Sequence, residues 1–88
     1  MPVLMEFWAE WCPPCKVLAP VLDSVAVETC DRLRLYKVNS EEYPELAVRF
    51  AVSSVPTLLV FRDGNLVKRM VGARGKRHLL EELAEVVS

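Results

Sequence analysis

The chain has 88 residues, of which 52% are hydrophobic and 26% are charged, and its formal net charge is −1. This length supports one small domain, residues 1–88, with a single core. The near balance of charges excludes a strong electrostatic field on the protein that would attract nucleic acid or an anionic membrane. No run of apolar residues approaches the roughly 18 that a membrane span needs.

Residues 3–8 form a short apolar and aromatic run, which predicts a strand buried in a parallel sheet. Glu6 interrupts this run. A buried carboxylate is costly unless it is paired or has taken up a proton. A buried Glu6 therefore needs a partner or a raised pKa, whereas an edge-facing Glu6 would be solvated.

Two cysteines, Cys12 and Cys15, stand where a helix pattern begins. Thiols separated by two residues lie on one turn, close enough for a disulfide, and we expect Cys12 to be exposed with Cys15 beneath it. At the N-cap, the Cys12 sulfur can face the unpaired N–H groups of the first turn, where the helix dipole favours the thiolate. The thiolate is the nucleophile in disulfide exchange, so this placement predicts an activated thiol.

The residues between the cysteines are Pro13 and Pro14, which lack N–H groups. If Cys12 caps the helix, the Cys15 N–H is the nearest backbone donor to its sulfur. We therefore expect the pKa of Cys12 to lie below the free value of about 8.5, without the extreme acidity of strong oxidants.

Apolar residues recur at helical steps from Cys12 to about Thr29 and predict a helix with one buried stripe. Pro20 lies inside this helix and predicts a kink rather than its end. Residues 32–39 alternate as a second strand, and Pro44 marks the first turn of a short helix that ends near Phe50. The predicted stripe consists of Val17, Leu18, Val21, Leu22, Val25 and Ala26.

The last third of the chain predicts a hairpin and a helix. Asp63-Gly64 joins strands at 57–61 and 66–71, and Gly75 precedes an amphipathic helix. The whole pattern predicts an α/β fold with the order βαβαββα. We expect a four-stranded mixed sheet of strand order 2-1-3-4, flanked by three helices on its two faces. The final helix should face the sheet with Leu79, Leu80, Leu83 and Val86.

An ordered set of segments resembles the thioredoxin family over nearly the whole chain. A C-x-x-C motif beside a βαβ pattern is typical of that fold. The chain resembles a short form without the usual N-terminal strand and helix, and Pro13 stands where thioredoxins usually carry Gly. The segments are Phe7-Trp8-Ala9-Glu10-Trp11-Cys12, Pro14-Cys15-Lys16, Ala19-Pro20, Lys37-Val38-Asn39, Val55-Pro56-Thr57, Asp63-Gly64 and Val71-Gly72-Ala73.

The resemblance implies a thioredoxin-like protein-disulfide reductase that uses no cofactor beyond a redox-active Cys12–Cys15 disulfide. Glu6 matches a buried acid, usually Asp, that exchanges protons with the second cysteine through water. Lys37 matches a lysine near that acid, and it is expected either to pair with Glu6 or to be solvated.

The resemblance also implies a substrate dock. Pro56 matches a cis proline beside the disulfide, and the residue before it offers its backbone to an extended substrate. Ser40 and Ser54 stand where thioredoxins often carry an apolar residue and a glycine, which narrows or shifts the range of partners. The dock would consist of Trp11, Val55, Pro56, Gly72 and Ala73.

The partners implied are disulfide-containing proteins and an electron donor, either a thioredoxin reductase or another dithiol, with a monomeric chain. The three cysteines form one close pair and an outlier, Cys30, which is not the framework of a secreted fold. Because the first residues read as a strand without a cationic leader, we expect a cytoplasmic protein.

Other interpretations stay open at this point. A disulfide oxidase or isomerase has the same fold and thiols, and a redox-inert binding module has the same fold. A zinc site would need Cys30 and His78 to join the cysteine pair from distant elements. Cys30 is a structural or incidental thiol, or else a reactive or dimer-forming one. A basic cluster is either a solvated face or a dock for an acidic partner: Arg62, Lys68, Arg69, Arg74, Lys76 and Arg77.

Overall fold

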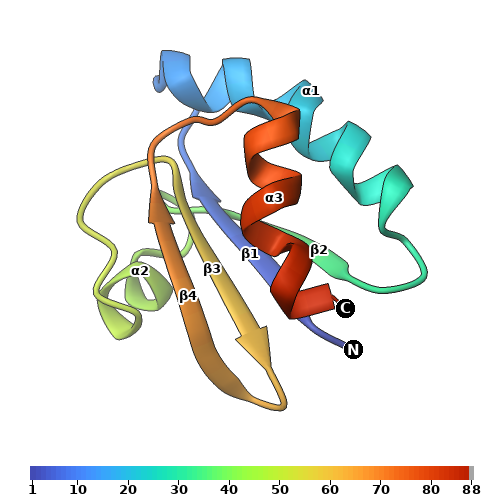
Figure 1. Cartoon of the computed structure of the whole chain (residues 1–88). Helices are drawn as coiled ribbons and strands as arrows, with labels where there is room; N and C mark the ends of the chain where they lie inside the picture. Colours follow the sequence, from blue (N-terminus) through green and yellow to red (C-terminus); the bar gives the residue numbers. More distant parts are fainter. Residues whose placement is uncertain (88) are drawn as a thin grey trace.

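The computed structural model describes residues 1–87. Its helices and strands follow the predicted order, and each lies within a few residues of its predicted range (Figure 1). The elements are β1 (Val3–Trp8), α1 (Pro13–Glu28), β2 (Arg34–Asn39), α2 (Pro44–Arg49), β3 (Thr57–Arg62), β4 (Asn65–Val71) and α3 (Lys76–Val87).

The four strands form one mixed sheet in the order β2-β1-β3-β4, as predicted. β1 is parallel to β2 and antiparallel to β3, and β3 is antiparallel to β4. Asp63 and Gly64 both have positive φ, which is the conformation that a tight hairpin turn between β3 and β4 requires. This order places the end of β1, which leads into α1, near the middle of the sheet.

The main core lies between one face of the sheet and the helices α1 and α3. The α1 helix continues through Pro20 and buries Leu18, Leu22 and Val25 at helical spacing. The prediction for Val17 was wrong, because its side chain is 67% exposed. Val17 lies about 100° around the helix from Leu18, which places it at the edge of the buried stripe, where its side chain reaches solvent. Other members of this core are Leu4, Leu33, Leu58, Val60, Met70, Leu79, Leu83 and Val86.

A smaller core lies on the opposite face of the sheet, where α2 packs apart from the other two helices (Figure 1). Its buried members are Phe7, Val38 and Leu59, against which Leu46 and Phe50 pack. Successive residues of a strand point to opposite faces, so Phe7 belongs to this core while Glu6 points toward α1. The sequence of β1 therefore fixes the side on which Glu6 meets the cysteine-bearing helix.

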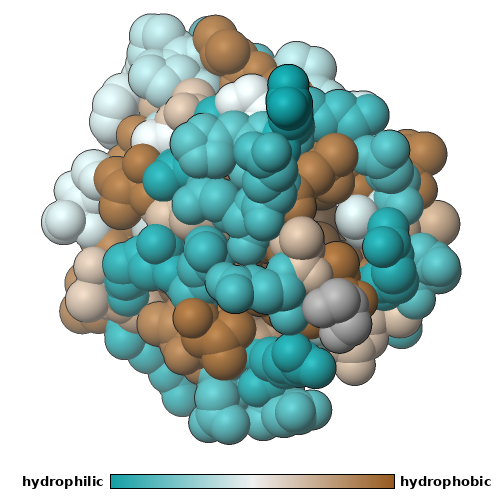
Figure 2. Space-filling model, viewed as in Figure 1, coloured by the Kyte–Doolittle hydropathy of each residue, from teal (hydrophilic) through white to brown (hydrophobic). Residues whose placement is uncertain are grey.

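The basic cluster is largely paired within the chain. Lys68 pairs with Glu85, Arg74 with Glu82, Lys76 with Glu28, and Arg77 with Glu81. Arg69 donates to the Phe50 carbonyl oxygen. Figure 2 shows that the face carrying α3 is mostly hydrophilic, with hydrophobic side chains in small separate patches. These contacts favour a solvated, internally neutralised face.

None of the helices within residues 1–87 is long and apolar enough to cross a membrane.

Candidate active site

Cys12 is the N-cap of α1, as predicted. Its sulfur accepts a hydrogen bond from the Cys15 backbone N–H at 3.2 Å. Pro13 and Pro14 occupy the first two helical positions and contribute no N–H to this cap. Within the first turn of α1, the Cys15 N–H is therefore the backbone group that donates to the Cys12 sulfur.

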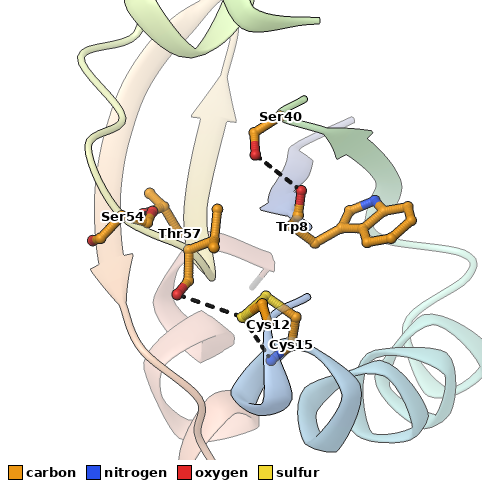
Figure 3. Close-up of a disulfide and its surroundings, with 7 residues drawn as sticks. Trp8, Cys12, Cys15, Ser40, Ser54 and Thr57 are labelled. Carbon is orange, nitrogen blue, oxygen red and sulfur yellow. Dashed lines mark hydrogen bonds between the residues drawn. A yellow bond between two sulfur atoms is a disulfide. The ribbon is translucent and has the colours of Figure 1, made fainter. Parts of the chain in front are cut away.

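Cys12 and Cys15 form a disulfide, with their Cα atoms 5.3 Å apart (Figure 3). The prediction that Cys12 is exposed was wrong, because only 2% of its surface is accessible, against 4% for Cys15. Both cysteines pack with Ala9, and Val55 lies against them from a loop 43 residues away. Helical spacing places the two sulfurs on one turn but does not reveal which distant loop covers them.

The loop before β3 brings its backbone to the disulfide. The Val55–Pro56 peptide bond is cis, as the resemblance implied. The Val55 carbonyl oxygen lies 3.7 Å from the Cys12 sulfur. Figure 3 shows the segment that carries Ser54 and Thr57 beside the cysteine pair, and the Thr57 hydroxyl donates to the Ser54 carbonyl at 2.6 Å. This hydrogen bond helps to fix the loop beside the sulfur.

The end of β4 joins this loop from the other side. The Gly72 N–H donates to the Pro56 carbonyl oxygen at 2.9 Å. Gly72 has a φ of 95°, a conformation that favours glycine. Ala73 follows it and is exposed, and Trp11, which precedes Cys12, is 65% exposed. Hydrogen bonds and packing thus connect Gly72 to Pro56 and to the disulfide, while Trp11 and Ala73 border this centre on the surface.

An open pocket of about 430 Å³ lies behind the second cysteine. Glu6, Trp8, Cys15 and Lys37 all line it. The Trp8 indole N–H is buried and lacks a hydrogen-bond partner among residues 1–87. A pocket of this size admits water, which can bond to such groups.

Glu6 lines this pocket and is buried, with 2% of its surface accessible, which agrees with the first of the two alternatives predicted for it. Burial raises the pKa of its carboxyl group above the ordinary value of 4.5. The positive charge of Lys37 opposes this rise in pKa, and the negative charge of Asp23 adds to it. Glu6 therefore holds a proton to a higher pH than a solvated glutamate does.

The alternative that paired Lys37 with Glu6 was wrong. Lys37 lies beside Glu6 in the parallel register of β1 and β2, yet its Nζ lies 2.9 Å from Oδ1 of Asp23 in α1. The Lys37 and Asp23 side chains are 36% and 70% exposed, so water stabilises both charges, whereas burial of Glu6 disfavours its charged form. Sequence reasoning missed Asp23, whose only signal was its place on the polar side of α1.

Comparison with known proteins decides the family. The Thioredoxin family model matches residues 1–85. A thioredoxin of Mycobacterium tuberculosis is 52% identical over 86 residues, which cover 98% of this chain and 74% of that protein. Thioredoxin 1 of Synechococcus elongatus is 43% identical over 83 residues, covering 94% of this chain and 78% of that protein.

The chain belongs to the thioredoxin family. Its Cys12–Cys15 pair makes it a thiol-disulfide oxidoreductase of that family, with the disulfide as its redox group. A bifunctional thioredoxin reductase/thioredoxin of Mycobacterium leprae is also similar. It is 49% identical over 86 residues, which cover 98% of this chain and 19% of that protein.

Two residues at which the chain departs from the usual thioredoxin pattern lie near this centre. The Ser40 hydroxyl and N–H both donate to the Trp8 carbonyl oxygen, at 3.1 and 2.9 Å (Figure 3). Ser40 thus helps to hold the end of β1 just before the cysteine loop. Ser54 is exposed in the loop that carries Val55.

The remaining candidate residues lie outside this centre. Across residues 1–87, no three metal-ligating side chains come together, so the zinc site that would use Cys30 and His78 is not assembled. Cys30 is exposed and forms no disulfide. The His78 side chain is 65% exposed on α3.

Proposed function

We propose that this chain reduces protein disulfides by dithiol exchange through its Cys-Pro-Pro-Cys motif. One observation carries the proposal: Cys12 caps α1 beside Cys15, and the carbonyl group of Val55 lies against its sulfur. Capping provides a hydrogen-bond donor and the positive end of the helix dipole for a thiolate. A sulfur in this position can be activated as a thiolate beside the loop that we propose receives the substrate.

The exchange takes two steps. The Cys12 thiolate attacks one sulfur of a substrate disulfide, forms a mixed disulfide and expels the first substrate thiolate. The Cys15 thiolate then attacks the Cys12 sulfur, forms the Cys12–Cys15 disulfide and expels the second. Two electrons pass from the cysteine pair to the substrate. The second step is fast because the attacking thiol is already held on the same turn.

We assign proton transfer for Cys15 to Glu6, through water in the pocket that both line. Burial raises the pKa of Glu6, so this carboxyl group can exchange a proton closer to neutral pH than a solvated glutamate can. Lys37 acts on the pKa of Glu6 through its charge while it is paired with Asp23. It is therefore a positioning and electrostatic residue in this proposal.

The dock for an extended substrate is the surface of Trp11, Val55, Pro56, Gly72 and Ala73. Exposed Trp11 and Ala73 offer contact area beside the disulfide. The backbone of Val55 lies next to the Cys12 sulfur, which attacks the substrate disulfide, and this position suits strand-like pairing with a substrate peptide. Ser54, exposed in the same loop, adds a polar contact that can shift the range of substrates.

The oxidised chain needs an external dithiol donor to return to the reduced state. We propose a thioredoxin reductase for this role, which the similarity to a bifunctional thioredoxin reductase/thioredoxin supports. Residues 1–88 would act as one domain and as a monomer. A reductant of this kind is suited to the cytoplasm, where thiols are kept reduced.

A trapping experiment tests the proposal. In Cys15→Ser, the mixed disulfide between Cys12 and a substrate protein should accumulate, because the second step is blocked. The same Ser substitution at Cys12 should trap nothing. The measurement is mass spectrometry of adducts formed with intact, disulfide-bonded insulin, in a Cys30→Ser background that removes the exposed third thiol. Equal trapping by both variants, or none by either, contradicts the assignment.

A further inference from the structure

Arg74 lies just beyond the proposed dock and contacts its backbone. One terminal nitrogen, Nη1, donates to the Val71 carbonyl oxygen at 3.0 Å and to the Gly72 carbonyl oxygen at 3.2 Å. Its Nε forms an ion pair with Oε2 of Glu82 in α3 at 2.5 Å. The guanidinium group thus joins the end of β4 to a helix of the core.

The contacts of Arg74 continue to the disulfide. The Gly72 N–H donates to the Pro56 carbonyl oxygen, and the neighbouring Val55 carbonyl oxygen lies 3.7 Å from the Cys12 sulfur. A continuous series of hydrogen bonds and ion pairs therefore runs from α3 to the loop that covers the redox centre. Arg74 is the residue that attaches this series to the helix.

The burial of this pair separates it from the other basic residues. The Arg74 and Glu82 side chains are 22% and 23% exposed, whereas Arg77, three residues further on, is 93% exposed. An ion pair with little access to solvent is screened less than a surface pair. The planar guanidinium group also presents several donors in fixed directions, which the single ammonium group of lysine does not.

We propose that Arg74 is a positioning residue for substrate binding, which holds the Gly72–Ala73 segment in the conformation that receives a protein disulfide. This inference rests on the proposed function. Gly72 has no side chain and a positive φ, so little in the segment itself fixes its backbone. Without the Arg74 hydrogen bonds, the segment has to be ordered when a substrate binds, and that ordering weakens binding.

The test compares two substrates of different size. Insulin requires the dock, whereas 5,5′-dithiobis(2-nitrobenzoic acid) needs only access to the sulfur. In Arg74→Met, the half-saturating insulin concentration in rapid mixing with the pre-reduced protein should rise by about two- to tenfold, with the limiting rate unchanged. The rate with the small disulfide should stay within about twofold of that of the unaltered protein. If insulin does not saturate, its second-order rate constant should fall by the same factor.

Two further variants control this test. Arg77→Met removes the same charge from an exposed residue that pairs with Glu81 within α3, and it should leave both substrates unaffected. Arg74→Lys keeps the charge but not the fork of donors, so its insulin reaction should be weakened as in Arg74→Met. An Arg74→Lys variant that behaves as the unaltered protein would overturn the role of the two carbonyl contacts.

A measurement without turnover completes the design. Amide hydrogen exchange at Gly72, followed by nuclear magnetic resonance, should be faster in Arg74→Met than in Arg77→Met. Unchanged exchange at Gly72 together with unchanged insulin binding overturns the inference, and so does an equal loss with both disulfides. Failure of the unaltered protein to reduce insulin refutes the proposed function instead, while the exchange measurement still decides whether Arg74 fixes the segment.

Discussion

The cap at Cys12 leads to a prediction about the two prolines that follow it. A capping side chain accepts hydrogen bonds from the backbone N–H of the second or third helical residue. The third is Cys15, whose N–H donates at 3.2 Å, and the second is Pro14, which has none. Pro14→Ala should therefore add a second donor to the Cys12 thiolate and lower the pKa of the thiol.

The size of this effect follows from the burial of the sulfur. A hydrogen bond to a charged group contributes about 1.5–3 kcal/mol. Cys12 is 2% exposed, so water screens this contribution little. At 1.36 kcal/mol per tenfold, Pro14→Ala should increase the acid dissociation constant of the thiol by about tenfold to a hundredfold. Pro13→Ala makes the same replacement at the first helical position, whose N–H does not point at the cap, and should have a much smaller effect.

The assay is the ultraviolet absorbance of the thiolate across pH, measured on the reduced proteins in a Cys30→Ser background. The pH dependence of alkylation by iodoacetamide, with the modified cysteine identified by mass spectrometry, assigns the titration to Cys12. The reasoning is refuted if Pro13→Ala lowers the pKa of Cys12 as much as Pro14→Ala does, or if neither lowers it.

Three further predictions concern stability and the buried acid. Glu6→Gln should gain stability relative to the unaltered protein as pH rises. Because burial raises the pKa of Glu6, the native state of the unaltered protein loses stability as pH rises from about 4.5 through that higher pKa, whereas glutamine does not titrate. Urea unfolding at several pH values measures the difference in stability between the two proteins. A difference that does not change with pH would contradict this prediction. Asp23→Asn should lower the pKa of Glu6, since it removes a nearby negative charge, and a carboxyl titration by nuclear magnetic resonance that shows no fall would count against this. Leu22→Ala should cost about 2–5 kcal/mol in the free energy of unfolding, whereas exposed Val17→Ala should change it by less than about 0.5 kcal/mol; similar costs would contradict the packing described for α1.

The order of the elements and their pairing could be predicted because the local signals agree. The period of apolar residues identifies α1 and α3, Asp63-Gly64 identifies the hairpin, and the cysteines with Pro13 mark a helix start. The resemblance to thioredoxins added the cis bond before Pro56, for which the sequence alone gives only a strand boundary.

The features that sequence reasoning missed all depend on contacts between distant segments. Cys12 was expected to be exposed, but Val55 covers it from another part of the chain. Lys37 was expected to pair with Glu6 or to be solvated, and only the packing of α1 against the sheet shows that it pairs with Asp23. Arg74 was interpreted as one member of a basic cluster, because the residues next to it in the sequence do not indicate that it donates to the Val71 and Gly72 carbonyl groups.

The equilibrium reduction potential of the Cys12–Cys15 pair against glutathione tests the central claim most directly, because it separates a reductant from an oxidant that has the same thiols. The account predicts a potential close to the value of about −270 mV typical of thioredoxin, so that the reduced pair donates its electrons to protein disulfides. A potential near the value of about −120 mV found in a strong oxidant would contradict it.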